Sequence, residues 1–224
     1  MLSNDVAEAP CDALLLTAKG RIIAPLRVLR RADDDFLLLT EPGLGQTVRS
    51  TLLRSRFAAK CEIESEEHVS TLVWSDSFDA AEEQLDADVA PTVGEEELER
   101  ARIEAGIPKW GAELDETILP AEAGLDRTHI SFTKGCYPGQ EPVARLHYRG
   151  HANRELRVLE IEGEELPARD AEVRHEGKAV GRVTSAVRRP DGTIVALGYV
   201  RAQVAEDAEL ELDRGRARST RRNS

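Results

Sequence analysis

The first half of the chain alternates short hydrophobic runs with turn-forming residues. Residues 13–29 predict a β-hairpin whose turn is Lys19-Gly20. Apolar residues at helical spacing predict a helix over 43–56. Residues 75–93 are acidic and weakly patterned, which we interpret as a helix flanked by loops. Three further strands are expected at 36–40, 61–65 and 69–74, so the pattern indicates an α+β layer.

A second helix is expected to begin at a capping box formed by Thr92 and Glu95. Its apolar stripe ends where Gly106 and a following proline stop the helix. Arg102 and Glu104 lie off this stripe. Two interpretations stay open for them: solvated surface charges, or side chains that face a ligand cleft.

After residue 153 the pattern changes to short, evenly spaced strands separated by glycine-containing turns. Such spacing predicts a small antiparallel barrel or sandwich. We therefore expect three parts: an α+β region at 1–153, a C-terminal β-barrel at 154–213 and a basic tail at 214–224.

The charge balance restricts the partners of the chain. The net charge of the 224 residues is -12, which argues against nucleic-acid binding over the whole surface because phosphate recognition needs a basic footprint. The tail at 214–224 carries five arginines and no acid. We interpret it as a disordered, solubilising end; contact with RNA or an acidic partner is the alternative.

Cysteine usage and hydropathy indicate a cytoplasmic protein. The three cysteines, Cys11, Cys61 and Cys136, are widely spaced and form no Cys-x-x-Cys pair, so a permanent metal or cluster site is not expected. This usage fits a reducing compartment. We find no signal peptide and no apolar run long enough to cross a membrane.

The segment 134–141, Lys-Gly-Cys-Tyr-Pro-Gly-Gln-Glu, is the main candidate for chemistry. Two glycines and a proline within eight residues favour a shaped loop. The loop presents Cys136 beside Lys134, with Arg145 and Arg149 a little further on. Thiolates are the reactive form, and nearby cations favour them.

Three roles are open for Cys136: a nucleophilic or sulfur-handling thiol, a transient iron or cluster ligand, and a buried structural cysteine. His147 and His151 lie four residues apart, a helical ligand spacing, so a metal site with Cys136 is another alternative. A Cys136–His147 nucleophile pair is a further alternative, for which the sequence offers no orienting third residue.

The same segment carries a family resemblance. Lys134-Gly135-Cys136-Tyr137-x-Gly139-Gln140-Glu141, followed by Val143-Ala144-Arg145, resembles the signature of the YgfZ proteins. These are folate-binding proteins related to the T-protein of glycine cleavage, an aminomethyltransferase. The resemblance extends to stretches at 3–6, 19–21, 102–108, 119–125 and 177–185.

The resemblance implies an aminomethyltransferase-like, folate-binding α+β fold closed by a C-terminal antiparallel β-barrel. It also implies tetrahydrofolate, or another folate, as cofactor. The implied role is that of an accessory factor in making or repairing iron–sulfur proteins, whose partners include tRNA-thiomethylating enzymes. Cys136 would be the functional thiol, with Lys134, Gln140 and Glu141 beside it.

A folate needs polar partners for its pterin edge, a flat apolar wall and a cation for its anionic tail. The residues that meet these demands by type are Arg102, Glu104, Trp110 and Arg145, with Lys134 as a second candidate for the tail.

Two departures from the family pattern matter. Family members usually carry a further strand and helix before the stretch that matches residues 3–6, so we expect a shortened first subdomain with an unpaired sheet edge. Aminomethyltransferases also carry an aspartate where this chain has Ala24 and Pro25, which disfavours one-carbon transfer. Such a transferase and an RNA-binding module remain the alternatives.

Overall fold

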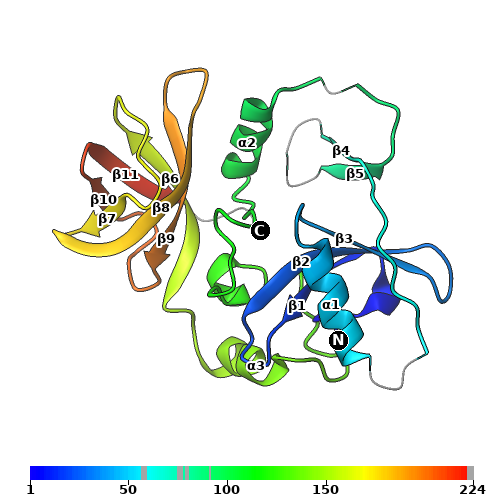
Figure 1. Ribbon diagram of the computed structural model, residues 1–224. Coiled ribbons are helices and arrows are strands. Elements are labelled where there is room, and N and C mark those ends of the chain that lie inside the picture. The colour runs from blue at the N-terminus through cyan, green and yellow to red at the C-terminus, as the bar shows by residue number, and fades with distance from the viewer. Residues whose placement is uncertain (57–59, 75–77, 79–80, 91, 221–224) are drawn as a thin grey trace. The chain divides into compact units, whose positions relative to one another are not determined.

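The structure is a computed structural model that describes residues 1–56, 60–74, 78, 81–90 and 92–220. The chain forms two compact units (Figure 1). Unit 1 comprises Met1–Glu66 and Leu114–Ala152, and unit 2 comprises Glu67–Glu113 and Asn153–Ser224. The predicted region 1–153 is therefore divided, because residues 67–113 pack with the barrel.

Unit 1 is built on a three-stranded antiparallel sheet of β1 (Cys11–Leu16), β2 (Ile22–Arg30) and β3 (Phe36–Thr40), with β2 in the centre. Buried and half-buried residues alternate along β2, as the period of a strand requires. The predicted hairpin is confirmed, and its turn holds Gly20 at a φ of 74°. Within the described residues β1 and β3 each pair with β2 alone.

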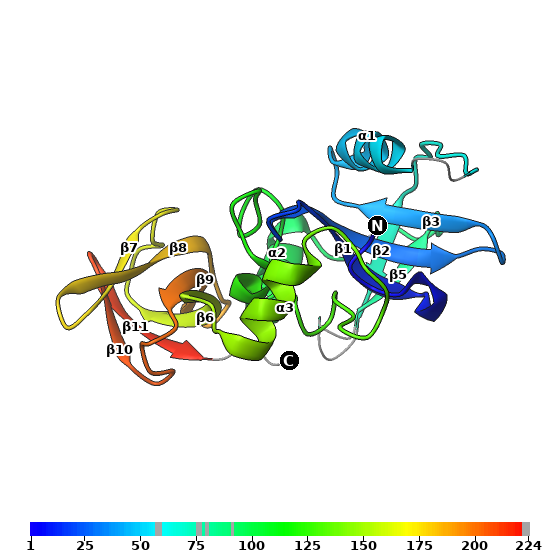
Figure 2. The same ribbon diagram turned by 90° about the horizontal axis from the view of Figure 1, so that it is seen from below.

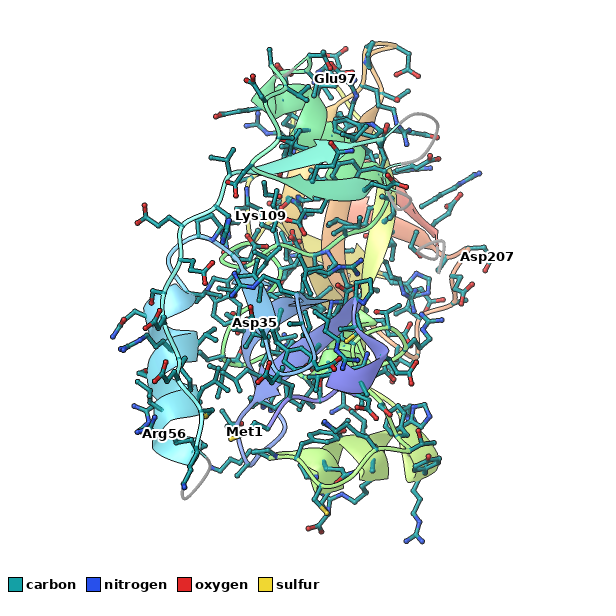
Figure 3. All side chains as sticks on the ribbon, turned by 90° about the vertical axis from the view of Figure 1, so that its right-hand side faces the viewer. Met1, Asp35, Arg56, Glu97, Lys109 and Asp207 are labelled. Atoms are coloured by element: carbon teal, nitrogen blue, oxygen red, sulfur yellow. The ribbon has the colours of Figure 1, made fainter. Side chains whose placement is uncertain are left out.

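Helices complete unit 1. The predicted first helix is confirmed as α1 (Gly45–Ser55), which packs against β2 and lies over one face of the sheet (Figure 2). Figure 3 labels Asp35 in the turn between β2 and β3, and Arg56 directly after α1. The remaining helices are η1 (Val6–Glu8), η3 (Pro120–Ala123) and α3 (Gln140–Arg149).

Unit 2 contains a closed antiparallel barrel in the order β10-β11-β6-β9-β8-β7, so the predicted fold class is confirmed. Its core is aliphatic, with fully buried Leu159, Val183 and Ile194 among its members. The helix α2 (Glu95–Glu104) packs on β8 and β9. The barrel strands are β6 (Arg154–Glu162), β7 (Glu172–His175), β8 (Lys178–Arg188), β9 (Ile194–Arg201), β10 (Glu209–Leu212) and β11 (Gly215–Thr220).

Several local predictions in the acidic middle segment are wrong. Residues 61–65 form no strand, and the expected helix within 75–93 is replaced by β5 (Glu82–Leu85), which pairs with β4 (Ser70–Val73). Residues 75–77, 79, 80 and 91 lie outside the described part. The capping residue of α2 is Gly94 rather than Thr92, and three glutamates in the first turn stabilise this helix end through the helix dipole.

The prediction of a disordered tail is also wrong. Residues Gly215–Thr220 form β11, which pairs with both β10 and β6. Ala217 and Ser219 are buried, whereas Arg216 and Arg218 are exposed. The tail thus has the period-two pattern of a half-buried strand, which its high charge concealed. Residues 221–224 lie outside the described part.

No helix in the described ranges is both long enough and apolar enough to cross a membrane.

Candidate functional site

The cysteine-bearing segment of unit 1 is a loop that leads directly into α3. Exposed and buried residues alternate along it: Cys136 is an exposed free thiol, Tyr137 is buried, and Gly139 is buried. Gly139 caps α3 in the left-handed region, at a φ of 83°. The residues that follow the thiol are therefore anchored, while the thiol itself faces solvent.

Gly139 is required by a close backbone contact with the turn of the β1–β2 hairpin. A Cβ at position 139 would lie 2.5 Å from the carbonyl oxygen of Thr17 and 2.9 Å from the Cα of Gly20. A Cβ on Gly20 would in turn lie 3.1 Å from the side chain of Val143, on α3. Only two glycines permit this approach, which explains why both the turn and the loop contain one.

Lys134 is committed to the N-terminal segment. Its Nζ donates hydrogen bonds to the carbonyl oxygens of Leu2 and Asn4, each at 2.8 Å. Burial lowers the pKa of Lys134, although the nearby carboxylate of Asp5 opposes this shift. The ammonium group thus ties the loop to the start of the chain, and its position beside Cys136 in sequence does not make it a partner of the thiol.

Tyr137 occupies the buried position next to the thiol. The Nζ of Lys134 lies 5.8 Å from the centre of its ring, a cation–π contact. Its hydroxyl group is buried without a hydrogen-bond partner within the described residues, and burial raises the pKa of Tyr137. The ring therefore fixes the backbone beside Cys136 by packing, at the expense of one unpaired hydroxyl.

The other signature residues lie on α3. Gln140 is half-buried and Glu141 is exposed, both in the first turn, where a carboxylate is favoured by the helix dipole. Arg145 is exposed one turn later. The structure therefore places Cys136, Gln140, Glu141 and Arg145 within one loop–helix element.

His147 and His151 do not form the helical pair that the metal-site alternative needs, because α3 ends at Arg149 and Gly150 follows it. The ring of His147 stacks on Phe132 with their centres 3.9 Å apart, and its Nδ1 lies 3.5 Å from Oδ2 of Asp126. Among the described residues no three His, Cys, Asp or Glu side chains are grouped as a metal site. His147 is thus held by a ring and a carboxylate.

The proposed folate residues Arg102, Glu104 and Trp110 belong to unit 2, and Arg102 is only 7% exposed. Its five N–H donors are matched by five acceptors. Two oxygens of Glu99 accept from Nε and Nη2 at 3.0 and 2.6 Å, and Oε2 of Glu113 accepts from Nη1 at 2.8 Å. The carbonyl of Ile107 and the hydroxyl of Ser185 accept the other two, at 2.6 and 3.2 Å.

This arrangement leaves no guanidinium N–H of Arg102 for a ligand, so its role is structural. Burial alone would lower the pKa of Arg102, but the hydrogen bonds and charges of Glu99 and Glu113 outweigh burial and raise that pKa. The hydrogen bond from Arg102 in turn lowers the pKa of Glu99. An arginine that the sequence offered as a ligand contact instead connects α2 to the barrel strand β8.

Glu113 is the residue that sequence reasoning missed. It is 1% exposed, and its Oε1 accepts a hydrogen bond from the hydroxyl of Ser185 at 2.6 Å. Its backbone carbonyl accepts one from the hydroxyl of Tyr199 at 3.0 Å. Its Oε2 also accepts the backbone N–H of Lys109. A buried carboxylate with this many donors is a structural centre of unit 2.

The remaining two candidates are less enclosed. Glu104 accepts a hydrogen bond from Nε of Arg189 at 2.6 Å, and its side chain is 37% exposed. Trp110 is half-buried. These two keep surface that a ligand can contact, in contrast to Arg102.

Comparisons with known proteins agree with this fold. The family model described as the glycine cleavage T-protein C-terminal barrel domain matches residues 154–221. The solved structure of the glycine cleavage system aminomethyltransferase T from Bartonella henselae superposes with a TM-score of 0.83 at 18% identity, covering 98% of this chain and 78% of that chain. These matches define the class: the chain has the aminomethyltransferase fold.

Curated relatives narrow the class. The tRNA-modifying protein YgfZ of Yersinia pestis (strain Pestoides F) is 34% identical over 115 residues, 49% of this chain and 35% of that protein. The tRNA-modifying protein YgfZ of Shigella boydii serotype 4 (strain Sb227) is 29% identical over 204 residues, 84% of this chain and 61% of that protein. The chain thus spans roughly one third to three fifths of these relatives. The resemblance to YgfZ proteins predicted from the cysteine signature is confirmed by these relatives.

The contact at Gly139 gives a stability prediction. Gly139→Ala should destabilise unit 1 by about 2–4 kcal/mol, because the new Cβ meets backbone atoms and the positive φ is strained. Urea denaturation followed by circular dichroism measures the change. Gly135→Ala is the control, since a Cβ there meets nothing within 4 Å. Equal stability of the two variants would contradict the proposed close contact.

The buried pair in unit 2 gives a second prediction. Glu113→Gln should lower the free energy of unfolding by about 3 kcal/mol, because it removes the buried charge that faces Arg102. Glu104→Gln is the matched control, and we expect it to lose at most about 1 kcal/mol since its ion pair with Arg189 is partly exposed. Denaturation midpoints compare the two; a smaller effect at position 113 than at 104 would refute the structural role.

Proposed function

We propose that the protein is a folate-binding accessory factor for iron–sulfur proteins, among them enzymes that thiomethylate tRNA. Cys136 is its functional thiol. The observation that carries this proposal is an exposed thiol on a loop whose neighbours are fixed by the buried Tyr137 and the close contact of Gly139. The relatives named tRNA-modifying proteins support the part that concerns tRNA.

The geometry favours a thiol that acts on a partner. Thiolates are soft ligands, and soft ligands favour the iron of iron–sulfur clusters. A permanent cluster requires about four cysteine ligands, and this chain has three widely separated cysteines. A single presented thiol suits a transient ligand or a sulfur-handling group that meets a cluster held by another protein, in a reducing cytoplasm.

The side chains of the protein fit a folate in part. Trp110 offers a half-buried indole for the pterin, and Glu104 offers a partly exposed carboxylate for its polar edge. Arg145 belongs to unit 1 and carries no part of this fit. Arg102 does not fit, since its donors are all engaged. When bound, tetrahydrofolate supplies a carrier for one-carbon units.

A one-carbon transferase is the less favoured function. Ala24 is fully buried in β2 opposite Leu15, and Pro25 lies opposite Leu14. Neither position holds a carboxylate that would assist transfer to a folate amine. The aminomethyltransferase fold is therefore shared with T-protein without the acidic group that its chemistry uses at this place.

The role of the thiol is tested by complementation of a bacterial strain that lacks its own family member. Cys136→Ala should reduce rescued tRNA thiomethylation at least about tenfold, because the variant keeps the loop and loses the sulfur. Mass spectrometry of digested tRNA measures the product. Cys61→Ala is the control, since Cys61 is also an exposed free thiol and should retain full rescue. Full rescue by Cys136→Ala would exclude a functional thiol at this position.

Folate binding is tested separately by calorimetric titration with tetrahydrofolate. We expect binding in the micromolar range, weakened about fivefold to tenfold by Trp110→Ala through the loss of roughly 1 kcal/mol of stacking. Trp74→Ala is the control, because Trp74 packs edge-to-face on Phe78. Absence of heat at several hundred micromolar folate, with folded wild-type protein, would overturn the cofactor assignment while leaving the thiol test valid.

A further inference from the structure

The outer face of α3 is a basic and aromatic surface. Arg145, Tyr148 and Arg149 are exposed and lie at positions i, i+3 and i+4, which share one face of a helix. Val143 is buried on the other side, against the hairpin turn. Figure 3 shows α3 as the yellow-green helix at the bottom, with side chains that project away from the strands. We name Arg145, Tyr148 and Arg149 the α3 face.

Within the described residues the two arginines of the α3 face make no hydrogen bond or ion pair. Arginines elsewhere in unit 1 are engaged: Arg27 pairs with Asp12 at 3.0 Å, and Arg31 pairs with Glu66 at 2.8 Å. The only acid on α3 is Glu141, in the first turn. In a chain of net charge -12, these two arginines, one turn apart, are a local excess of positive charge.

Tyr148 is supported as a stacking platform. Tyr148 is 67% exposed, and among the described residues no other aromatic residue belongs to the exposed large hydrophobic ones. The rings of His147 and Phe132 meet it edge-on, with centres 4.9 and 5.8 Å away, and they stack on each other. An exposed ring held by two others is preorganised to receive a flat partner.

We propose that the α3 face binds single-stranded RNA. Tyr148 stacks on an unpaired base while Arg145 and Arg149, about 6 Å apart along the helix axis, contact the flanking phosphates. The carboxylates of an acidic protein surface would match the two arginines but offer no flat ring on which Tyr148 can stack. Duplex RNA keeps its bases stacked inside, so an unpaired segment is favoured.

The proposed RNA contact lies on α3 and not on the C-terminal tail. The tail is the barrel strand β11, whose exposed arginines have no aromatic residue between them. The residues of unit 2 proposed for the pterin, Trp110 and Glu104, take no part in the α3 face. Loss of folate binding and loss of RNA binding are therefore separate outcomes.

The test uses fluorescence anisotropy with a fluorescein-labelled 12-nucleotide single-stranded RNA, without folate, at several salt concentrations. Arg145→Ala/Arg149→Ala should weaken binding at least about tenfold and reduce the slope of log affinity against log salt by about 1.4, the value for two lost phosphate contacts. Tyr148→Ala should weaken binding about fivefold or more without changing that slope, whereas Tyr148→Phe should bind as wild type does.

The matched control is Arg216→Ala/Arg218→Ala on β11, which removes the same charge and should leave RNA affinity unchanged. Circular dichroism verifies that each variant is folded. No binding of wild-type protein at 100 µM, a concentration about that of weak nonspecific binding, would overturn the proposal. So would an unchanged affinity of Tyr148→Ala together with equal binding of polyglutamate, a result that assigns the face to acidic proteins.

Discussion

The contact between Gly139 and the turn around Gly20 is the constraint on which the candidate site depends. It brings a helix start and a hairpin turn to a distance that no Cβ permits, and it fixes the direction in which α3 leaves the sheet. The loop before Gly139 must then span the gap to Lys134, which is tied to the N-terminal segment. Cys136 is exposed because both ends of its short loop are held.

Charged residues near a candidate site are poor guides to its chemistry until their partners are known. Lys134 and Arg102 both looked suited to a thiolate or a folate, and both are used inside their own unit. Replacing an arginine that is buried with five acceptors lowers the stability of the fold, and its donors are unavailable to a ligand. Arg145 is exposed and makes no hydrogen bond within the described residues, so its donors remain available to an anion.

The sequence predicted the parts of the fold that depend on local pattern. The β1–β2 hairpin follows from alternating apolar residues around Lys19-Gly20, and the barrel follows from regularly spaced turns. The helix α3 was not predicted because Pro138 and two glycines argued for a loop over 134–141, whereas α3 begins within that segment, at Gln140. Pro142 is the third residue of α3, where its missing N–H would have no partner in any case.

The parts that could not be predicted depend on residues far apart in the chain. Arg102 meets Ser185, 83 positions away, so no window around α2 reveals that the arginine is buried. The tail was misjudged for a different reason: its arginines dominate the composition, while Ala217 and Ser219 carry the pattern that pairs with β6. The charge of a segment indicates which partners it can bind. The spacing of its small residues indicates which face of it packs against the rest of the fold. The same holds for α3. The buried Val143 packs the helix against the hairpin, whereas the exposed arginines remain available to a partner.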